Sequence, residues 1–195
     1  MMARREQSNV PAEEVRTELH QLLAERAFIT GDFLLSSGRR SSWYFDGKQV
    51  TLDGRGLFLA ATLVLERCRR LGVDAIGGLT MGADPLTAGV VALSGHSEVS
   101  LHGFLVRKDA KGHGTAKTIE GPPLRSGTRV VLVDDVVTTG KAFLEAREQV
   151  APTGAEIVEA IAMVDREEGG RENLAAQGLS LHALFLRSDF PATNG

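Results

Sequence analysis

Two adjacent acidic residues, Asp134 and Asp135, directly follow the apolar run from Val130 to Val133. Such a run predicts a strand that is buried on both faces of a parallel sheet. Neighbouring carboxylates repel each other and are costly to remove from water, so burial alone does not account for the pair. Open α/β sheets bind ligands at the carboxyl ends of their strands, and we therefore expect the two acids to accept hydrogen bonds from substrate hydroxyl groups.

The residues that follow the acids are suited to an anion. The segment from Val136 to Lys141 contains Thr138, Thr139 and Gly140 and leads into a predicted helix. Backbone N–H groups in a turn at a helix start can bind a phosphate group. The acids can bind hydroxyl groups and the turn can bind an anion. Together they indicate a ribose phosphate as the ligand.

Other phosphate-binding motifs fit this segment less well. A Walker A loop needs a glycine five residues before its Gly-Lys pair and a Ser or Thr after it, but Asp135 and Ala142 occupy those positions. No Gly-x-Gly-x-x-Gly dinucleotide motif follows a strand. A Mg²⁺ site of a nucleotidase or ATPase stays open as another use of the two acids, although the threonine-glycine turn favours a 5′-phosphate.

Apolar spacing and capping residues predict the elements that hold this segment. Before residue 73 we expect a helix from Pro11 to about residue 28, a hairpin over 33–46, and a helix capped by Asp53 that ends at Gly72. Beyond it we expect strands at 74–79, 99–106, 130–133, 157–164 and 179–186, a helix capped by Asp84, and a helix over 141–150. This alternation predicts an α/β fold with a parallel sheet, right-handed crossovers and helices on both faces.

One segment breaks the alternation. Residues 108–121, which follow Arg107, have no apolar periodicity and contain three lysines and three glycines. A structureless stretch of this length in a small domain is usually functional and is typical of a lid over a site. A solvated connector is the alternative interpretation.

These motifs carry a family resemblance. Residues 131–140 resemble the phosphoribosyl diphosphate (PRPP) signature of the type I phosphoribosyltransferases: an apolar strand, two acids, two apolar residues, Thr, a small residue and Gly. Four further segments resemble those of the orotate phosphoribosyltransferases within that family. They are the lid at 107–114, the pyrophosphate-side loop at 77–85, the N-terminal hood at 33–45 and the base-side loop at 165–170. The similarity covers roughly residues 15–190.

The resemblance implies a fold, a reaction and partners. It implies a single phosphoribosyltransferase domain over 1–195, with a hood from about 11–50 plus the C-terminal segment, a core at about 53–190 and a lid at 107–121. The implied reaction joins orotate and PRPP to give orotidine 5′-monophosphate and pyrophosphate in pyrimidine synthesis, with Mg²⁺ as cofactor. It also implies a homodimer in which the lid, with Lys111 and His113, acts in the neighbouring subunit's site.

The resemblance also assigns site residues. Implied as catalytic are Lys111, His113, Asp134 and Asp135. Implied as PRPP-binding are these four together with Arg107, Lys108, Val136, Val137, Thr138, Thr139, Gly140 and Lys141. Implied as orotate-binding are Thr138, Arg166, Tyr44 and Phe45. Mg²⁺ is expected to be held mainly by substrate and water, with no metal ligands from protein side chains.

The chain departs from the family at two positions: many members have lysine where this chain has Ser36, and a Tyr-Lys pair where it has Met81 and Gly82. A type I transferase for another base, or a non-catalytic regulator that senses PRPP, therefore stays open beside the orotate enzyme. The retained lid cations and the orotate-type Arg166 favour the enzyme.

Bulk properties bound the class of protein. The 195 residues carry a net charge of −3 and are 43% hydrophobic, which does not favour a nucleic-acid or membrane-binding surface. Cys68 is the single cysteine, so an intramolecular disulfide is impossible. We expect Cys68 to serve in packing. The polar N-terminal residues and the lack of a long apolar run predict a cytoplasmic protein.

Overall fold

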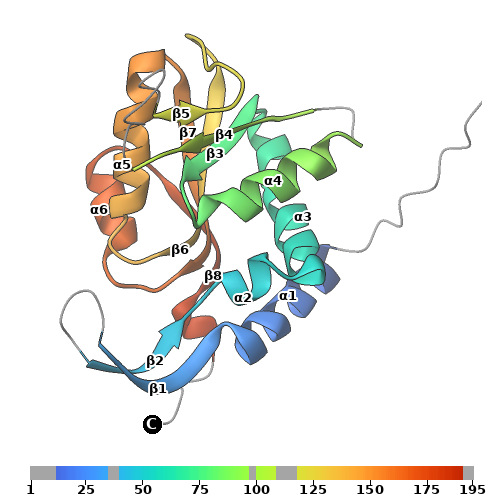
Figure 1. Cartoon of the computed structure of the whole chain (residues 1–195), viewed down its shortest axis with the longest axis vertical. Helices are drawn as coiled ribbons and strands as arrows, with labels where there is room; N and C mark the ends of the chain where they lie inside the picture. The colour runs from blue at the N-terminus through green and yellow to red at the C-terminus, as the bar shows by residue number, and fades with distance from the viewer. Residues whose placement is uncertain (1–11, 35–39, 97–99, 109–117, 191–195) are drawn as a thin grey trace, which may run out of the picture.

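The computed structural model describes residues 12–34, 40–96, 100–108 and 118–190. Its centre is a twisted six-stranded sheet with helices on both faces, and a two-stranded hairpin projects beyond one end (Figure 1). No helix within these described ranges is long and apolar enough to cross a membrane.

The sheet has the strand order β5-β4-β3-β6-β7-β8. Its strands are β3 (Ala75–Leu79), β4 (His102–Val106), β5 (Ile119–Glu120), β6 (Arg129–Val137), β7 (Glu156–Asp165) and β8 (Leu181–Leu186). All neighbouring pairs are parallel except β4 and β5. The mostly parallel α/β fold is therefore confirmed, with one antiparallel edge strand that the sequence pattern did not reveal.

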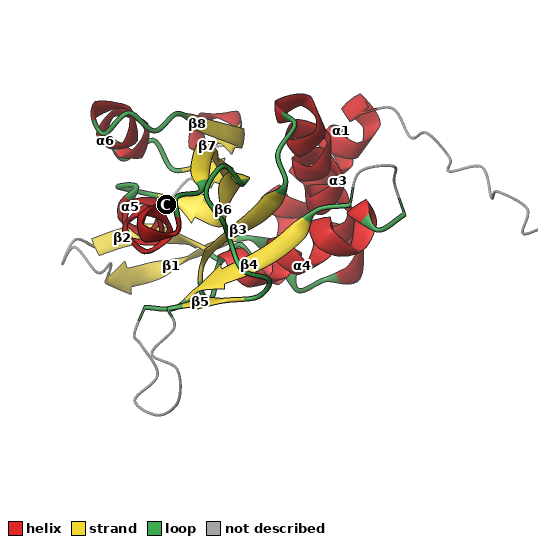
Figure 2. Cartoon of the chain, turned by 90° about the horizontal axis from the view of Figure 1, so that it is seen from above, coloured by secondary structure: helices red, strands yellow, loops and turns green. Residues whose placement is uncertain are grey.

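Helices cover the sheet from two sides (Figure 2). One side carries α3 (Gly54–Leu71) and α4 (Ala83–Ser94), with α1 (Ala12–Arg26) packed beside α3. The other side carries α5 (Lys141–Val150) and α6 (Gly170–Ala176). Three short helical elements complete the described chain: α2 (Lys48–Thr51), η1 (Ala151–Thr153) and η2 (Arg187–Asp189). Each side has its own cluster of buried apolar residues, which explains why β6 is apolar on both faces.

The N-terminal hairpin consists of β1 (Phe28–Leu34) and β2 (Arg40–Phe45). The expected hairpin is present but begins five residues early, and the first helix ends at Arg26 rather than near residue 28. Phe28 pairs with Phe45 across the hairpin and contacts the rings of Trp43 and Phe190. An extended backbone at Phe28 permits these contacts, so packing overrides the helical spacing there.

The helix caps were predicted with mixed success. The carboxylate of Asp53 accepts hydrogen bonds from the backbone N–H of Arg55 (3.1 Å) and Gly56 (2.9 Å), and Gly72 ends α3 in a left-handed conformation, as expected. Asp84 does not cap α4. That helix begins at Ala83 because Gly82 already has helical dihedral angles, which places Asp84 inside the first turn.

Several predicted strand ends also shift. β4 begins at His102, while its predicted start at residue 99 lies outside the described residues. β6 continues to Val137, so both acids lie inside the strand and the phosphate turn starts at Thr138 rather than Val136. Residues 119–120 of the expected lid form β5, paired with Leu105 and Val106.

Candidate functional site

The predicted acid pair is buried at the centre of the sheet. Asp134 and Asp135 are 9% and 6% exposed and lie near the carboxyl end of β6, between β3 and β7. The backbone N–H of Asp135 donates to Asp134 Oδ1 at 3.0 Å. Burial raises the pKa of Asp134 well above its usual range, and the neighbouring charge of Asp135 raises it further. Burial also raises the pKa of Asp135.

Two glycines enclose these carboxylates. A Cβ atom on Gly82 would overlap Oδ1 of both acids, and one on Gly47 would lie 2.8 Å from Asp135 Oδ2. Gly82 is a position where many family members have lysine. A side chain there could not be accommodated against the acids in their present positions, so the glycine allows the loop between β3 and α4 to approach the acid pair.

Two lysines act on the pair electrostatically. Lys108, at the start of the lid segment, lowers the pKa of Asp134, and Lys48, at the start of α2, lowers that of Asp135. The ammonium group of Lys48 lies 2.6 Å from Asp46 Oδ1, and hydrogen bonds from Lys48 and Gln49 hold the pKa of Asp46 low despite its partial burial. Sequence reasoning missed Lys48. The only local signal is the polar Asp46-Gly47-Lys48 segment directly after the hairpin.

The predicted phosphate turn follows β6. Gly140 has a left-handed conformation with φ of 81° and caps α5. Among the described residues, none accepts a hydrogen bond from the backbone N–H groups of Thr138, Thr139, Gly140 or Lys141. These donors lie at a helix start and are therefore available to an anion. The side chain of Lys141 is 82% exposed and pairs with Glu145, so only its backbone belongs to the turn.

α6 supports this turn from behind. Asn173 Nδ2 donates to the carbonyl oxygen of Thr139 at 3.1 Å. A Cβ on Gly140 would lie 2.9 Å from Leu174 Cγ, so the turn and the helix are in close contact. The turn is thus held by tertiary packing as well as by its own residue types.

Arg166 lies at the end of β7, beside the turn. Its backbone N–H donates to Val137 O at 2.9 Å, which joins it to β6. Its guanidinium lies 4.7 Å from the centre of the Trp43 ring and pairs with Glu168 at 2.7 Å. The predicted orotate residues Thr138 and Arg166 are therefore on neighbouring strand ends.

The two hairpin aromatics predicted to cover orotate differ in their surroundings. Tyr44 is 39% exposed and lies beside Phe33, with ring centres 5.6 Å apart. Phe45 is buried and packs edge-on against Phe28 at 5.1 Å. Phe45 is therefore part of the core in this structure, and a role for either ring against the base stays a prediction.

The predicted lid at 107–121 is described only at its two ends. Arg107 is joined to Thr118 by a backbone hydrogen bond of 2.8 Å, and its guanidinium lies 3.7 Å from Glu120 Oε1. Lys111 and His113, both predicted to be catalytic, lie outside the described residues. Elsewhere, Cys68 is buried as expected, and burial raises the pKa of its thiol to about 12.

Comparison with known proteins places this site in a class. Residues 60–178 match the family model described as a phosphoribosyl transferase domain, and the chain belongs to that family. The matched range contains the acid pair, the turn and Arg166.

Individual relatives show to which group within this family the chain belongs. The orotate phosphoribosyltransferase of Synechocystis sp. is 44% identical over 179 residues, which cover 92% of this chain and 90% of the relative. That of Aquifex aeolicus is 41% identical over 177 residues, covering 89% and 96%. Within the phosphoribosyl transferases, the chain belongs with the orotate phosphoribosyltransferases.

Solved structures agree with this assignment. Orotate phosphoribosyltransferase of Mycobacterium tuberculosis in complex with Fe(III) dicitrate superposes with a TM-score of 0.80 at 34% identity, covering 90% of this chain and 98% of that one. The same enzyme in complex with PRPP gives a TM-score of 0.75 at 31% identity, with the same coverage. The expected family and fold are thereby confirmed.

Proposed function

We propose that this protein transfers the 5-phosphoribosyl group of PRPP to orotate, releasing pyrophosphate and forming orotidine 5′-monophosphate in pyrimidine synthesis. The observation that carries this proposal is the buried Asp134–Asp135 pair next to a turn whose backbone N–H groups have no acceptor among the residues that the structure describes. The turn is suited to the 5′-phosphate, and the acids are suited to the ribose hydroxyls. Arg166, on the next strand end, is suited to the carboxylate of orotate.

The acid pair supports the reaction electrostatically. The bond between C1 of the ribose and the pyrophosphate oxygen breaks, and a bond from C1 to the attacking base nitrogen forms on the opposite face. Positive charge develops on the ribose ring as pyrophosphate leaves. Two carboxylates that accept hydrogen bonds from the ribose hydroxyls would stabilise this charge, because they are already oriented before the reaction begins.

Cations are needed for the departing pyrophosphate. Arg107 and Lys108 lie at the start of the lid, and Lys108 is close enough to influence Asp134. We propose that Lys111 and His113 complete this set. Closure of the lid would also exclude water that could otherwise hydrolyse PRPP.

Magnesium fits the same place. Burial raises the pKa of both carboxylates, the charge of Asp135 raises that of Asp134 further, and a nearby divalent cation would favour the charged forms. Carboxylate oxygens suit Mg²⁺, which usually keeps several ligands from substrate and water. When bound, Mg²⁺ would neutralise charge on the pyrophosphate. Asp134 and Asp135 are the residues that would face it.

We further propose a cytoplasmic homodimer in which each lid serves the partner's site. The lid-sharing proposal rests on the resemblance of residues 107–114 to the family lid. A buried, unreactive Cys68 agrees with a reducing compartment.

A substrate assay tests the reaction. Purified protein with PRPP and Mg²⁺ should consume orotate, seen as a fall in its ultraviolet absorbance, and release one pyrophosphate for each orotate consumed. Adenine, hypoxanthine and uracil serve as competing bases in parallel reactions. Turnover of one of these without turnover of orotate would reject the proposal, as would PRPP binding without turnover of any base.

A mixing experiment tests the shared lid. Lys111→Ala and Asp135→Asn should each be nearly inactive, but their mixture should regain activity, because half of the heterodimer sites combine an intact lid with intact acids. Subunit exchange is verified with differently tagged chains. Activity that stays at the sum of the two parents despite exchange would show that each lid serves its own subunit.

A further inference from the structure

Arg166 has an unusual environment for a substrate-binding arginine. Its side chain is only 9% exposed, and its Nε is buried without a hydrogen-bond partner among the described residues. A carboxylate oxygen of Glu168 lies 2.7 Å from its guanidinium. A long side chain in such a place needs other contacts to keep one conformation, because fixing an arginine side chain costs rotamer entropy.

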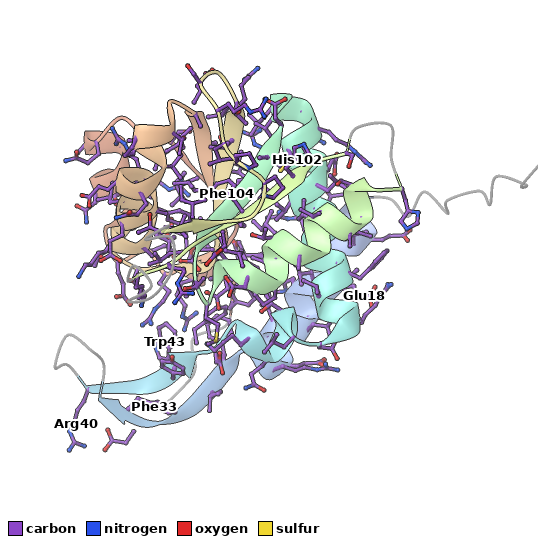
Figure 3. The ribbon with its side chains drawn as sticks, turned by 45° about the horizontal axis from the view of Figure 1, so that its top comes forward. Glu18, Phe33, Arg40, Trp43, His102 and Phe104 are labelled. Atoms are coloured by element: carbon purple, nitrogen blue, oxygen red, sulfur yellow. The ribbon has the colours of Figure 1, made fainter. Side chains whose placement is uncertain are left out.

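The indole of Trp43 supplies such a contact. The guanidinium of Arg166 lies 4.7 Å from the centre of this ring, and the guanidinium of Arg187 lies at the same distance. We call Trp43, Arg166 and Arg187 the tryptophan clamp. Figure 3 shows Trp43 where the hairpin meets the body of the molecule, with Phe33 and Arg40 further out along the hairpin.

The clamp joins three segments that are distant in sequence: β2, the end of β7 and η2. Arg187 is itself fixed, since it donates to the carbonyl oxygen of Phe190 at 3.0 Å and lies 5.2 Å from the Phe28 ring. Phe28 in turn lies 5.7 Å from Trp43. The indole is therefore held from several sides and presents a rigid π-face to Arg166.

This arrangement addresses the orientation of the arginine. A guanidinium binds a carboxylate through two parallel N–H groups, which requires its plane to be fixed. Stacking on an aromatic ring fixes that plane while leaving N–H groups at the edge for a ligand. Without the ring, the ion pair with Glu168 would hold Arg166 without an aromatic face to fix the plane of its guanidinium.

We propose that Trp43 is a positioning residue for the pyrimidine substrate, holding the Arg166 guanidinium in the orientation that receives the carboxylate of orotate. This inference rests on the proposed function, since it takes orotate as the substrate. Trp43 acts through Arg166 and need not touch the reacting atoms. The contact between Trp43 and Arg166 links the hood to substrate selection, and no local sequence motif predicts it because the two residues are far apart in the chain.

A graded series at position 43 tests the proposal. Trp43→Leu removes the aromatic face and should raise the KM for orotate about 5- to 30-fold. The KM for PRPP and the kcat should stay within about threefold, because the acids and the turn are untouched. Trp43→Phe and Trp43→Tyr keep a π-face and should fall between wild type and Trp43→Leu.

Phe58→Leu is the matched control. It removes another arginine–aromatic contact, in which Arg55 lies 5.5 Å from the Phe58 ring on α3, away from the acids. It should leave both KM values unchanged. Equal rises in the KM for orotate and for PRPP in Trp43→Leu would overturn the proposal. So would a KM for orotate in Trp43→Phe as high as in Trp43→Leu.

Fluorescence gives a readout that does not depend on activity. Trp43 is the only tryptophan in the chain, so the emission reports the clamp alone. Arg166→Met should change the emission spectrum, whereas Phe58→Leu should not, and unchanged emission in Arg166→Met would overturn the clamp. Failure of the proposed function would give a different result: the wild-type emission would still change in Arg166→Met, but the wild-type protein would not consume orotate.

Discussion

At the scale of single residues, the acid pair shows how function can oppose stability. Asp134 and Asp135 are buried next to each other, and burial raises the pKa of both. In the folded protein their charged forms are thus less favourable than in the unfolded chain. The site keeps this unfavourable arrangement because a substrate with hydroxyl groups, a cation, or both can compensate for it.

Asp134→Asn should therefore stabilise the protein and abolish most of its activity. A carboxyl group whose folded pKa lies above its unfolded value destabilises the fold once the pH exceeds that unfolded value. Removing the charge should raise the free energy of unfolding at pH 7–8 by about 1 kcal/mol or more, and the Tm by about 2–4 °C. Activity should fall by about 10²-fold or more.

Thermal unfolding from pH 3 to pH 8 checks this expectation. The gain in stability of Asp134→Asn over the wild type should shrink at acidic pH, where the wild-type carboxyl group is protonated in both the folded and the unfolded state. Asp32→Asn makes the same charge change at an exposed position on the hairpin and should have little effect. A variant that is less stable than wild type at pH 8 would contradict the account.

Lys48 offers a second prediction at this scale. Its charge lowers the pKa of Asp135, so Lys48→Met should raise that pKa. The acidic limb of kcat/KM for PRPP against pH should then move to higher pH, since Asp135 must be ionised to support the ribose. Lys48→Arg keeps the charge and should restore the wild-type profile. Superimposable profiles for all three proteins would show that Lys48 does not tune the site.

At the scale of elements, the phosphate turn depends on the contact between α5 and α6. Gly140 combines a positive φ with close approach to Leu174, so its hydrogen side chain serves both the backbone conformation and the packing. The same packing holds the backbone of the turn in place.

Gly140→Ala should weaken PRPP binding more than it weakens the fold. The expected loss of stability is about 1–3 kcal/mol, from the strained conformation and the contact with Leu174. The KM for PRPP should rise about tenfold or more, because displaced N–H groups lose the phosphate. Gly127→Ala is the control, since Gly127 has the same φ of 81° but open space around it. A similar KM for PRPP in both variants would reject a special role for the turn.

At the scale of the whole molecule, the hood hairpin is attached to the core by aromatic packing. Phe190, which follows η2, stacks on His20 of α1 with ring centres 4.5 Å apart and contacts Phe28 of β1 at 4.7 Å. Its ring also lies 5.9 Å from that of Phe185 in β8. The C-terminal part of the described chain thus helps to position the hairpin that carries Trp43.

Phe190→Ala should destabilise the protein and also disturb the orotate site. Removing a buried phenylalanine costs about 3–5 kcal/mol, which corresponds to a fall in Tm on the order of 10 °C. The KM for orotate should rise because the hairpin loses the contact between the Phe190 and Phe28 rings, which helps to hold Trp43 in place. Phe190→Leu fills most of the volume, so its stability and its KM for orotate should both lie close to those of the wild type. Thermal unfolding measures the change in stability, and steady-state kinetics measure the KM for orotate. A fall in the free energy of unfolding of Phe190→Ala below about 1 kcal/mol would show that the hood is held by other contacts.

Much of this protein follows from its sequence because the relevant residues are contiguous. The strand, the two acids and the threonine-glycine turn occupy residues 130–140, and each is specified by local residue types. Helix α3 is marked by Asp53 and Gly72, whose capping preferences are equally local. The motifs at 107–114 and 165–170 add the family resemblance, which the comparisons confirm.

Other features were decided only by the tertiary structure. Phe28 belongs to a strand because its contacts with Trp43 and Phe190 outweigh the local pattern, and α4 begins at Ala83 because Gly82 already has helical dihedral angles. The enclosure of the acids by Gly82, the influence of Lys48 on Asp135 and the stacking of Arg166 on Trp43 each join segments far apart in the chain.

The physical reason is the range of the forces involved. Periodicity, capping and turn preferences act over a few residues and can be read along the chain. Desolvation, charge coupling and ring stacking depend on distances of a few ångströms between segments, which exist only after the sheet and the hood have packed. The sequence by itself therefore determined which chemical groups are available and the family they define, and the tertiary structure decided how their charges and orientations are set.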